Sequence, residues 1–146
     1  MVDSPEHVSE RKTVYGEDNY GSEFSDERDL SKFLEDDAQA GVLKVTATTG
    51  RGLVPIKDAR VYVTKMLDGD RVIFFKGLTD ESGAIEDIVL PAPSRAISFD
   101  KDGGTPYSSY DIKIEHPLYE TMYVYNVPIF EGIKSIQNVS MNEKGV

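Results

Sequence analysis

Residues 43–65 read LKVTATTGRGLVPIKDARVYVTK, and this stretch decides the fold class. From Leu43 to Ala47, and again from Ala59 to Val63, every second residue is a small or branched apolar one. Strand side chains point to alternate faces of a sheet, so a period of two predicts strands with one buried and one wet face. The Gly- and Pro-containing segment between the two runs is typical of a turn.

The same period recurs along the chain from residue 41 onward. Turn segments rich in Gly and Asp separate the runs at intervals of about eight to twelve residues, as in a β-sandwich. We therefore predict an all-β fold, a seven-stranded antiparallel Ig-like sandwich over residues 41–146. The predicted strands are 42–48, 59–66, 71–78, 84–90, 109–116, 119–127 and 133–141. The predicted core residues are Leu43, Val45, Val61, Val63, Ile88, Leu90, Ile112, Ile114, Val124 and Val139.

The N-terminal part of the chain has a different composition. Residues 1–25 are rich in Glu, Asp, Ser and Gly and have no sustained period, which predicts a disordered acidic tail. In residues 26–40, Leu30, Phe33 and Leu34 fall at helical spacing behind several acids, which predicts a short amphipathic helix and a linker. A helix this short is only marginally stable alone in water, so its apolar face must pack against another surface. That surface is either the chain's own sandwich or a partner, including a second copy of the chain.

Negative charge is concentrated in the same region. Residues 1–40 carry 12 acidic and 4 basic residues, whereas the remainder carries 14 and 12, within a formal net charge of −10. Without a basic cluster the sandwich is not expected to bind nucleic acid or a membrane. The chain has no cysteine, which excludes disulfides and thiolate chemistry. No signal peptide is recognisable at the N-terminus, so we expect synthesis in the cytoplasm and predict no final location from composition.

Several motifs resemble a known superfamily. GLVPIKDARVYV at 52–63 and LTDESG at 78–83 are similar to the "P-hydrophobic-x-x-A-x-V" strand and "T-D-x-x-G" turn of carboxypeptidase-regulatory-like, transthyretin-like domains. LPAP at 90–93, PYSSYDI at 106–112 and NVPIFEGIKSIQ at 126–137 resemble modules in clostridial spore- and peptidoglycan-associated proteins. In such a turn the Thr and Asp oxygens would cap backbone N–H groups and the Gly would take a positive φ.

The resemblance covers about residues 41–141 and implies a transthyretin-like β-sandwich. It also implies a non-catalytic structural or interaction module that becomes part of a bacterial spore or cell envelope. A protein partner or self-assembly through the N-terminal segment, with Leu30, Phe33 and Leu34 as docking residues, is then expected. The alternative is a module that binds a glycan or peptidoglycan.

Tyrosines are numerous for so small a domain, and three of them fall at predicted outward positions of strands. Tyr62, Tyr123 and Tyr125 are the candidate binding residues for a glycan or protein surface, because tyrosine suits places where one end is apolar and the other wet. The competing interpretation is that these rings pack the sandwich and its rim.

Residues with catalytic or metal-binding potential are few. Only two histidines are present, His7 and His116, too few for a histidine triad or zinc site without distant partners. Asp100 opens a segment like the start of a calcium loop, but its twelfth position is Asp111 rather than a chelating Glu. We therefore predict no catalytic residue, no metal site, no cofactor and no enzymatic activity.

An internal isopeptide bond is a further possibility for a fold of this kind. Lys44, Glu115 and Asn138 have the chain order that such a bond between Lys and Asn requires. The period of two argues against it, because Leu43 and Ile114 pointing inward would turn the adjacent Lys44 and Glu115 outward.

Overall fold

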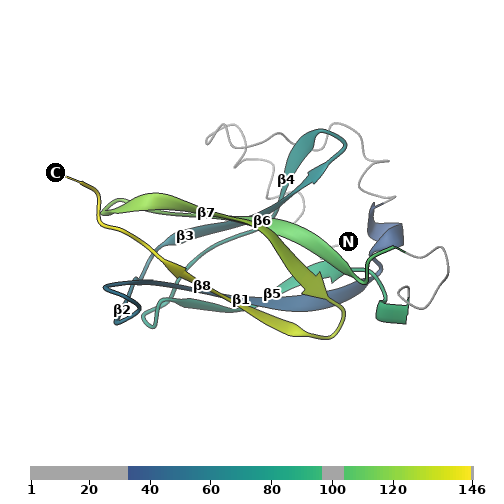
Figure 1. The fold of residues 1–146 in the computed structure, drawn as a ribbon, viewed down its shortest axis with the longest axis horizontal. Helices are drawn as coiled ribbons and strands as arrows, with labels where there is room; N and C mark the ends of the chain where they lie inside the picture. The colour runs from purple at the N-terminus through teal and green to yellow at the C-terminus, as the bar shows by residue number, and fades with distance from the viewer. Residues whose placement is uncertain (1–32, 97–103, 146) are drawn as a thin grey trace.

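Two β-sheets packed face to face make up the fold (Figure 1). The computed structural model describes residues 33–96 and 104–145. Sheet A consists of β1 (Gln39–Thr49), β2 (Val54–Pro55), β5 (Ala84–Ala92) and β8 (Lys134–Ser140). Sheet B has the order β4-β3-β6-β7 and consists of β3 (Arg60–Leu67), β4 (Asp70–Leu78), β6 (Tyr107–His116) and β7 (Tyr119–Phe130). No helix within these ranges is long and apolar enough to cross a bilayer.

The all-β prediction is confirmed, but two of its details are wrong. The described ranges contain eight strands rather than seven, because Val54–Pro55 pairs with the end of β1 as β2. The pairing is also not wholly antiparallel, since β8 runs parallel to β1, with Thr48 opposite Ser140. In addition, β1 begins at Gln39, inside the predicted linker. A period of two identifies an extended segment but says nothing of its neighbour or of their relative direction.

The core lies between the sheets and is filled by residues that the period of two assigns inward. Nine of the ten predicted core residues are buried, and the tenth, Val124, is partly buried against the same cluster. This cluster joins Leu43 and Val45 of β1 to Val61 and Val63 of β3. A slip of one residue in either strand would turn its whole apolar set to solvent, so burial fixes the register.

The turn between β4 and β5 holds the segment that leads into β3. Thr79 is buried there, and its hydroxyl donates to the carbonyl oxygen of Ile56 at 2.6 Å and accepts from the N–H of Ala59 at 2.9 Å. Backbone bonds join the same segments, since the N–H of Thr79 reaches Ala59 O at 2.9 Å and the N–H of Asp58 reaches Thr79 O at 3.0 Å. One threonine therefore connects the entry of β3 to the exit of β4.

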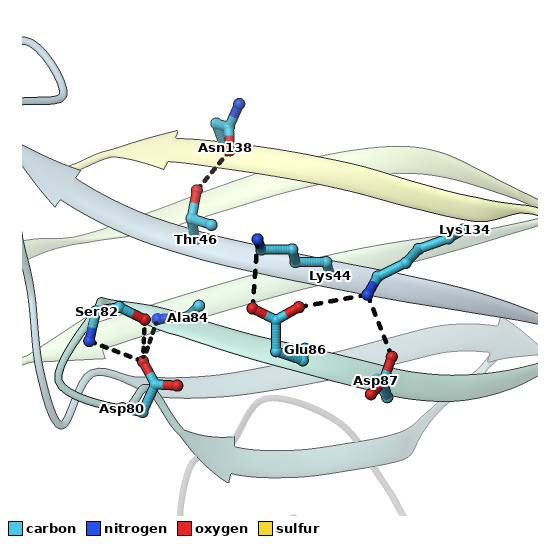
Figure 2. A network of polar contacts seen from close by, with 9 residues as sticks. All are labelled: Lys44, Thr46, Asp80, Ser82, Ala84, Glu86, Asp87, Lys134 and Asn138. Atoms are coloured by element: carbon cyan, nitrogen blue, oxygen red, sulfur yellow. Dashed lines mark hydrogen bonds and ion pairs between the residues drawn. The ribbon is translucent and has the colours of Figure 1, made fainter.

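Residues 80–83 complete this turn, and the Asp80 side chain caps backbone N–H groups there, as the sequence predicts. Oδ1 of Asp80 accepts the Ser82 hydroxyl at 2.7 Å and the N–H of Ala84 at 3.0 Å (Figure 2). These bonds favour the carboxylate and lower the pKa of Asp80, the Ser82 side chain most. Gly83 has a φ of 77°, and a Cβ on it would lie 2.6 Å from the carbonyl oxygen of Ala47. Only glycine fits this position.

A helical turn, residues 33–36, precedes β1. The ring of Phe33 packs edge-on against Phe74 with the centroids 5.5 Å apart, at the margin of the core. Leu34 is 40% exposed, and Leu30 lies outside the described residues. Of the three predicted docking residues, Phe33 thus contacts the chain's own sandwich.

Two charged side chains, Lys65 and Asp37, are partly desolvated close to this helical turn. Nζ of Lys65 donates to the carbonyl oxygen of Ser109 at 2.9 Å and lies 5.2 Å from the ring centroid of Tyr110. Desolvation lowers the pKa of Lys65. Desolvation also raises the pKa of Asp37, against the opposing effects of a hydrogen bond to Ser108 and of the Lys65 charge. Oδ2 of Asp37 is buried and makes no hydrogen bond within the described ranges.

Replacing Thr79 with valine tests the turn. Thr79→Val keeps the shape of the side chain but leaves the buried N–H of Ala59 without its hydroxyl acceptor, so we expect a loss of about 1–3 kcal/mol in the free energy of unfolding. Urea denaturation measures it. Thr121→Val, at an exposed position of β7, is the matched control and should change stability little. Equal effects of the two variants would contradict the role of Thr79.

Replacing Asp37 with asparagine tests the desolvated carboxyl. Its pKa is raised above 3.8 in the folded state, so the folded protein binds this proton more tightly and stability falls as the pH rises from 3.8 through the raised pKa. Asp37→Asn removes this penalty and should raise Tm at pH 7, with the difference disappearing below pH 3.8. Glu120→Gln on exposed β7 should leave Tm unchanged. A lower Tm of Asp37→Asn at pH 7 would contradict the assignment.

Candidate functional site

The outer face of sheet B carries most of the aromatic and ionic side chains that sequence analysis singled out. Alternation along its strands, with the cross-strand register, defines the members of this face. They include Arg60, Tyr62, Thr64, Arg71, Ile73, Lys76, Asp111, Lys113, Glu115, Tyr123 and Tyr125.

Tyr123 and Tyr125 form an exposed aromatic pair on β7. Met122 and Val124 pack against the core, so the two tyrosines point outward from the same strand. Their ring planes are parallel within 2° and their centroids are 6.1 Å apart. The residues are 44% and 59% exposed. Two predicted binding residues are thus brought together as parallel, partly exposed rings.

Tyr62 does not join this pair, and the expectation that it is exposed is wrong. Only 1% of the residue is accessible, although alternation places it on the outer face. Its hydroxyl donates to Glu115 at 3.3 Å, and Nζ of Lys113 lies 5.3 Å from its ring centroid. The sequence pattern gives the direction of a side chain but not what lies over it.

Tyr62 and Tyr123 are nevertheless linked by one cross-strand row. Lys76 of β4 is opposite Tyr62, Tyr62 is opposite Lys113 of β6, and Lys113 is opposite Tyr123 of β7. Lysine and tyrosine therefore alternate across all four strands of sheet B. The lysines were missed by sequence reasoning because their order depends on a pairing between distant segments.

Ion pairs flank this row. Arg71 contacts Asp111 at 2.8 Å with both side chains largely buried, and it also donates to Thr64 at 3.0 Å. Glu115 contacts Lys113 at 3.4 Å and Arg60 at 3.8 Å. A largely buried pair such as Arg71–Asp111 orients its partners more than it stabilises the fold. These ion pairs hold the surface around the row in one arrangement.

The proposed isopeptide residues lie on opposite faces of the sandwich. Lys44 pairs with Glu86 at 3.3 Å on the outer face of sheet A, where Lys134 also reaches Glu86 (Figure 2). Oδ1 of Asn138 accepts the hydroxyl of Thr46 at 2.5 Å on the same face. Glu115, the acid such a reaction needs, is on sheet B. The geometry agrees with the outward phase predicted from the sequence.

The candidate metal and histidine residues have structural contacts. Asp111 binds Arg71 and accepts the N–H of Asn126 at 2.9 Å. Nδ1 of His116 accepts the N–H of Leu118 at 3.1 Å. Asp100 lies outside the described residues, and those that are described contain no group of three or more metal-ligating side chains.

An open groove of about 680 Å³ lies beside these residues at the end of sheet B. Basic Arg60, His116 and Lys144 line it together with acidic Asp58 and Glu115. The mixture of charges favours no single class of ligand.

The comparisons with known proteins assign this chain neither a family nor a function. No protein-family model and no curated protein matches the chain. The Bacillus anthracis TIE protein is 13% identical, with 72% of this chain and 17% of that protein covered and a TM-score of 0.44. The 3-chlorocatechol 1,2-dioxygenase of Rhodococcus opacus 1CP is 10% identical, with coverage of 73% and 61% and a TM-score of 0.46.

A 9R-lipoxygenase from Cyanothece is 12% identical, with 73% of this chain and 17% of that protein covered and a TM-score of 0.39. The chain thus spans less than two thirds of each of these three proteins. At these identities and TM-scores the likeness carries no argument.

The intact mass of the protein tests the absence of an isopeptide bond. Because Lys44 is paired with Glu86 and Asn138 with Thr46, we expect the mass of the sequence without the loss of one ammonia. Mass spectrometry of the purified chain measures it. A loss of one ammonia that Lys44→Ala abolishes would contradict the structure described for these strands.

Proposed function

We propose that the protein is a non-catalytic interaction module of a bacterial spore or cell envelope and that it binds a glycan through Tyr123 and Tyr125. The observation that carries the proposal is the parallel arrangement of two exposed rings on β7, 6.1 Å apart. Side chains this apolar and this accessible are placed for contact with a second molecule.

A glycan suits this pair for a chemical reason. One face of a sugar ring presents C–H groups, which pack on an aromatic ring, while its hydroxyls hydrogen-bond at the periphery. Tyrosine offers both an apolar face and a polar hydroxyl. Two parallel rings from one strand would present the same kind of contact to two parts of an extended polymer.

The envelope location and the transthyretin-like character of the sandwich come from the sequence motifs. Thr79, Asp80 and Gly83 make the contacts that such a motif requires, which supports the resemblance. The non-catalytic part of the proposal is supported by the polar residues near the tyrosines, because Arg71, Asp111 and Glu115 are held in ion pairs.

Binding to purified peptidoglycan tests the proposal. The double variant Tyr123→Ala, Tyr125→Ala should lose roughly fivefold to 150-fold in affinity, since two stacking contacts are worth about 1–3 kcal/mol together. Sedimentation with peptidoglycan sacculi, followed by titration with soluble muropeptides, measures it. Ile136→Ala, an exposed apolar change on sheet A, is the matched control and should bind like the wild type.

Two results would contradict the proposal. One is failure of the wild type to bind peptidoglycan or any of a panel of envelope glycans. The other is equal binding by the wild type and the double tyrosine variant, which would move the contact surface away from β7. Circular dichroism of the variant should be unchanged, because both tyrosines are exposed.

A further inference from the structure

We propose that two copies of this chain associate through the open edge of β8 (Lys134–Ser140), which pairs antiparallel with β8 of the second copy. Sheet A then continues from one copy into the other. This edge belongs to sheet A, whereas Tyr123 and Tyr125 lie on sheet B. The association therefore goes beyond the proposed function and does not depend on glycan binding.

Half of the backbone groups of β8 face away from β1. The carbonyl oxygen of Ile133 accepts the N–H of Val42 at 3.0 Å, and the N–H of Met141 donates to the carbonyl oxygen of Thr48 at 2.7 Å. Backbone groups alternate in direction along a strand, so the odd-numbered residues of β8 bond to β1. The even-numbered residues point their N–H and C=O groups toward the open edge. Among the described strands, β8 pairs only with β1.

The other three edge strands have features that hinder pairing with a further strand. β5 contains Pro91, which has no N–H to donate, and it exposes two acidic side chains. β7 contains Pro128, and the N–H of Glu120 near its start is already bonded to the C-terminal segment. β4 has a bulge at Phe74, where its register with β3 shifts. These three edges are therefore poor templates for another chain.

β8 is a regular and nearly uncharged edge. It pairs with β1 in unbroken register from Lys134 to Ser140, it contains no proline, and Lys134 is its one charged residue. Ile136, close to the middle of the strand, is 61% exposed. A straight edge strand with an exposed apolar centre offers both unpaired backbone groups and an apolar contact to a neighbouring strand.

A second copy fits this edge because β8 is complementary to itself. In an antiparallel pair with a two-fold axis at Gln137, Lys134 lies opposite Ser140 and Ile136 lies opposite Asn138 of the second copy. Even-numbered residues then face even-numbered ones, so that their outward N–H and C=O groups meet in hydrogen-bonded pairs. The two lysines lie at opposite ends of the pair, and the two Ile136 side chains are diagonal neighbours beside the axis.

Analytical ultracentrifugation of the full chain over a range of concentrations tests the association. The wild type should form a dimer. Ile136→Lys should raise its dissociation constant about tenfold or more, because the symmetry counts each lost contact twice and brings like charges together. Val89→Lys is the matched control, since Val89 is 60% exposed on the outer face of β5 in the same sheet. It should dimerise like the wild type.

Disulfide cross-linking tests the register of the pair. The chain has no native cysteine, so Gln137→Cys introduces a single thiol at the proposed axis. Residues opposite each other in a non-hydrogen-bonded antiparallel pair have Cα atoms about 4.5 Å apart, which a disulfide can span. Mild oxidation should therefore produce a covalent dimer on a non-reducing gel. Val89→Cys, away from the axis, should cross-link at least about tenfold more slowly, because its thiols meet only by collision.

Three results would each overturn the proposal. They are a wild type that stays monomeric at every concentration, an Ile136→Lys variant that dimerises as tightly as the wild type, and a Gln137→Cys variant that cross-links no faster than Val89→Cys. Circular dichroism should show that Ile136→Lys is folded, because the side chain is exposed. Should that variant unfold, the cross-linking rates of the two cysteine variants decide the question.

Discussion

The pairing of β1 with every other strand of its sheet is the constraint on which the fold depends. β2, β5 and β8 are each hydrogen-bonded to β1, although β5 and β8 come from distant parts of the chain. The inward residues of β1, Leu43 and Val45, are also completely buried against sheet B. Register, layer spacing and the position of the C-terminal strand are therefore all set by one segment.

The sequence predicts well what depends on local alternation. Val61 and Val63 point inward because their spacing allows nothing else in a strand with one buried face, and the Thr79–Gly83 turn has the bonds that its residue types require. Prediction from the sequence fails for features that depend on contacts between segments distant in the chain. The parallel pairing of β8, the burial of Tyr62 and the lysine–tyrosine row all depend on which strands become neighbours, and no local period contains that information.

The candidate site likewise has features that the local sequence predicts and features that depend on strand pairing. That Tyr123 and Tyr125 share a face follows from their separation by one residue in a strand. The position of Lys113 beside Tyr123 follows from the pairing of β6 with β7. The two outer faces of the sandwich consequently differ in character. Sheet A presents a network in which Lys134 bridges Glu86 and Asp87, whereas sheet B presents aromatic rings between ion pairs.

The parallel ladder between β1 and β8 has a mechanical consequence. The start of β1 and the C-terminus lie at opposite ends of the long axis of the domain (Figure 1). Tension applied through the two ends would draw these strands in opposite directions along their axes, loading the pairs from Val42–Lys134 to Thr48–Ser140 in shear. Bonds loaded together resist far more than bonds opened singly from one end. Tension along this axis would therefore have to break the ladder as a whole rather than one pair at a time.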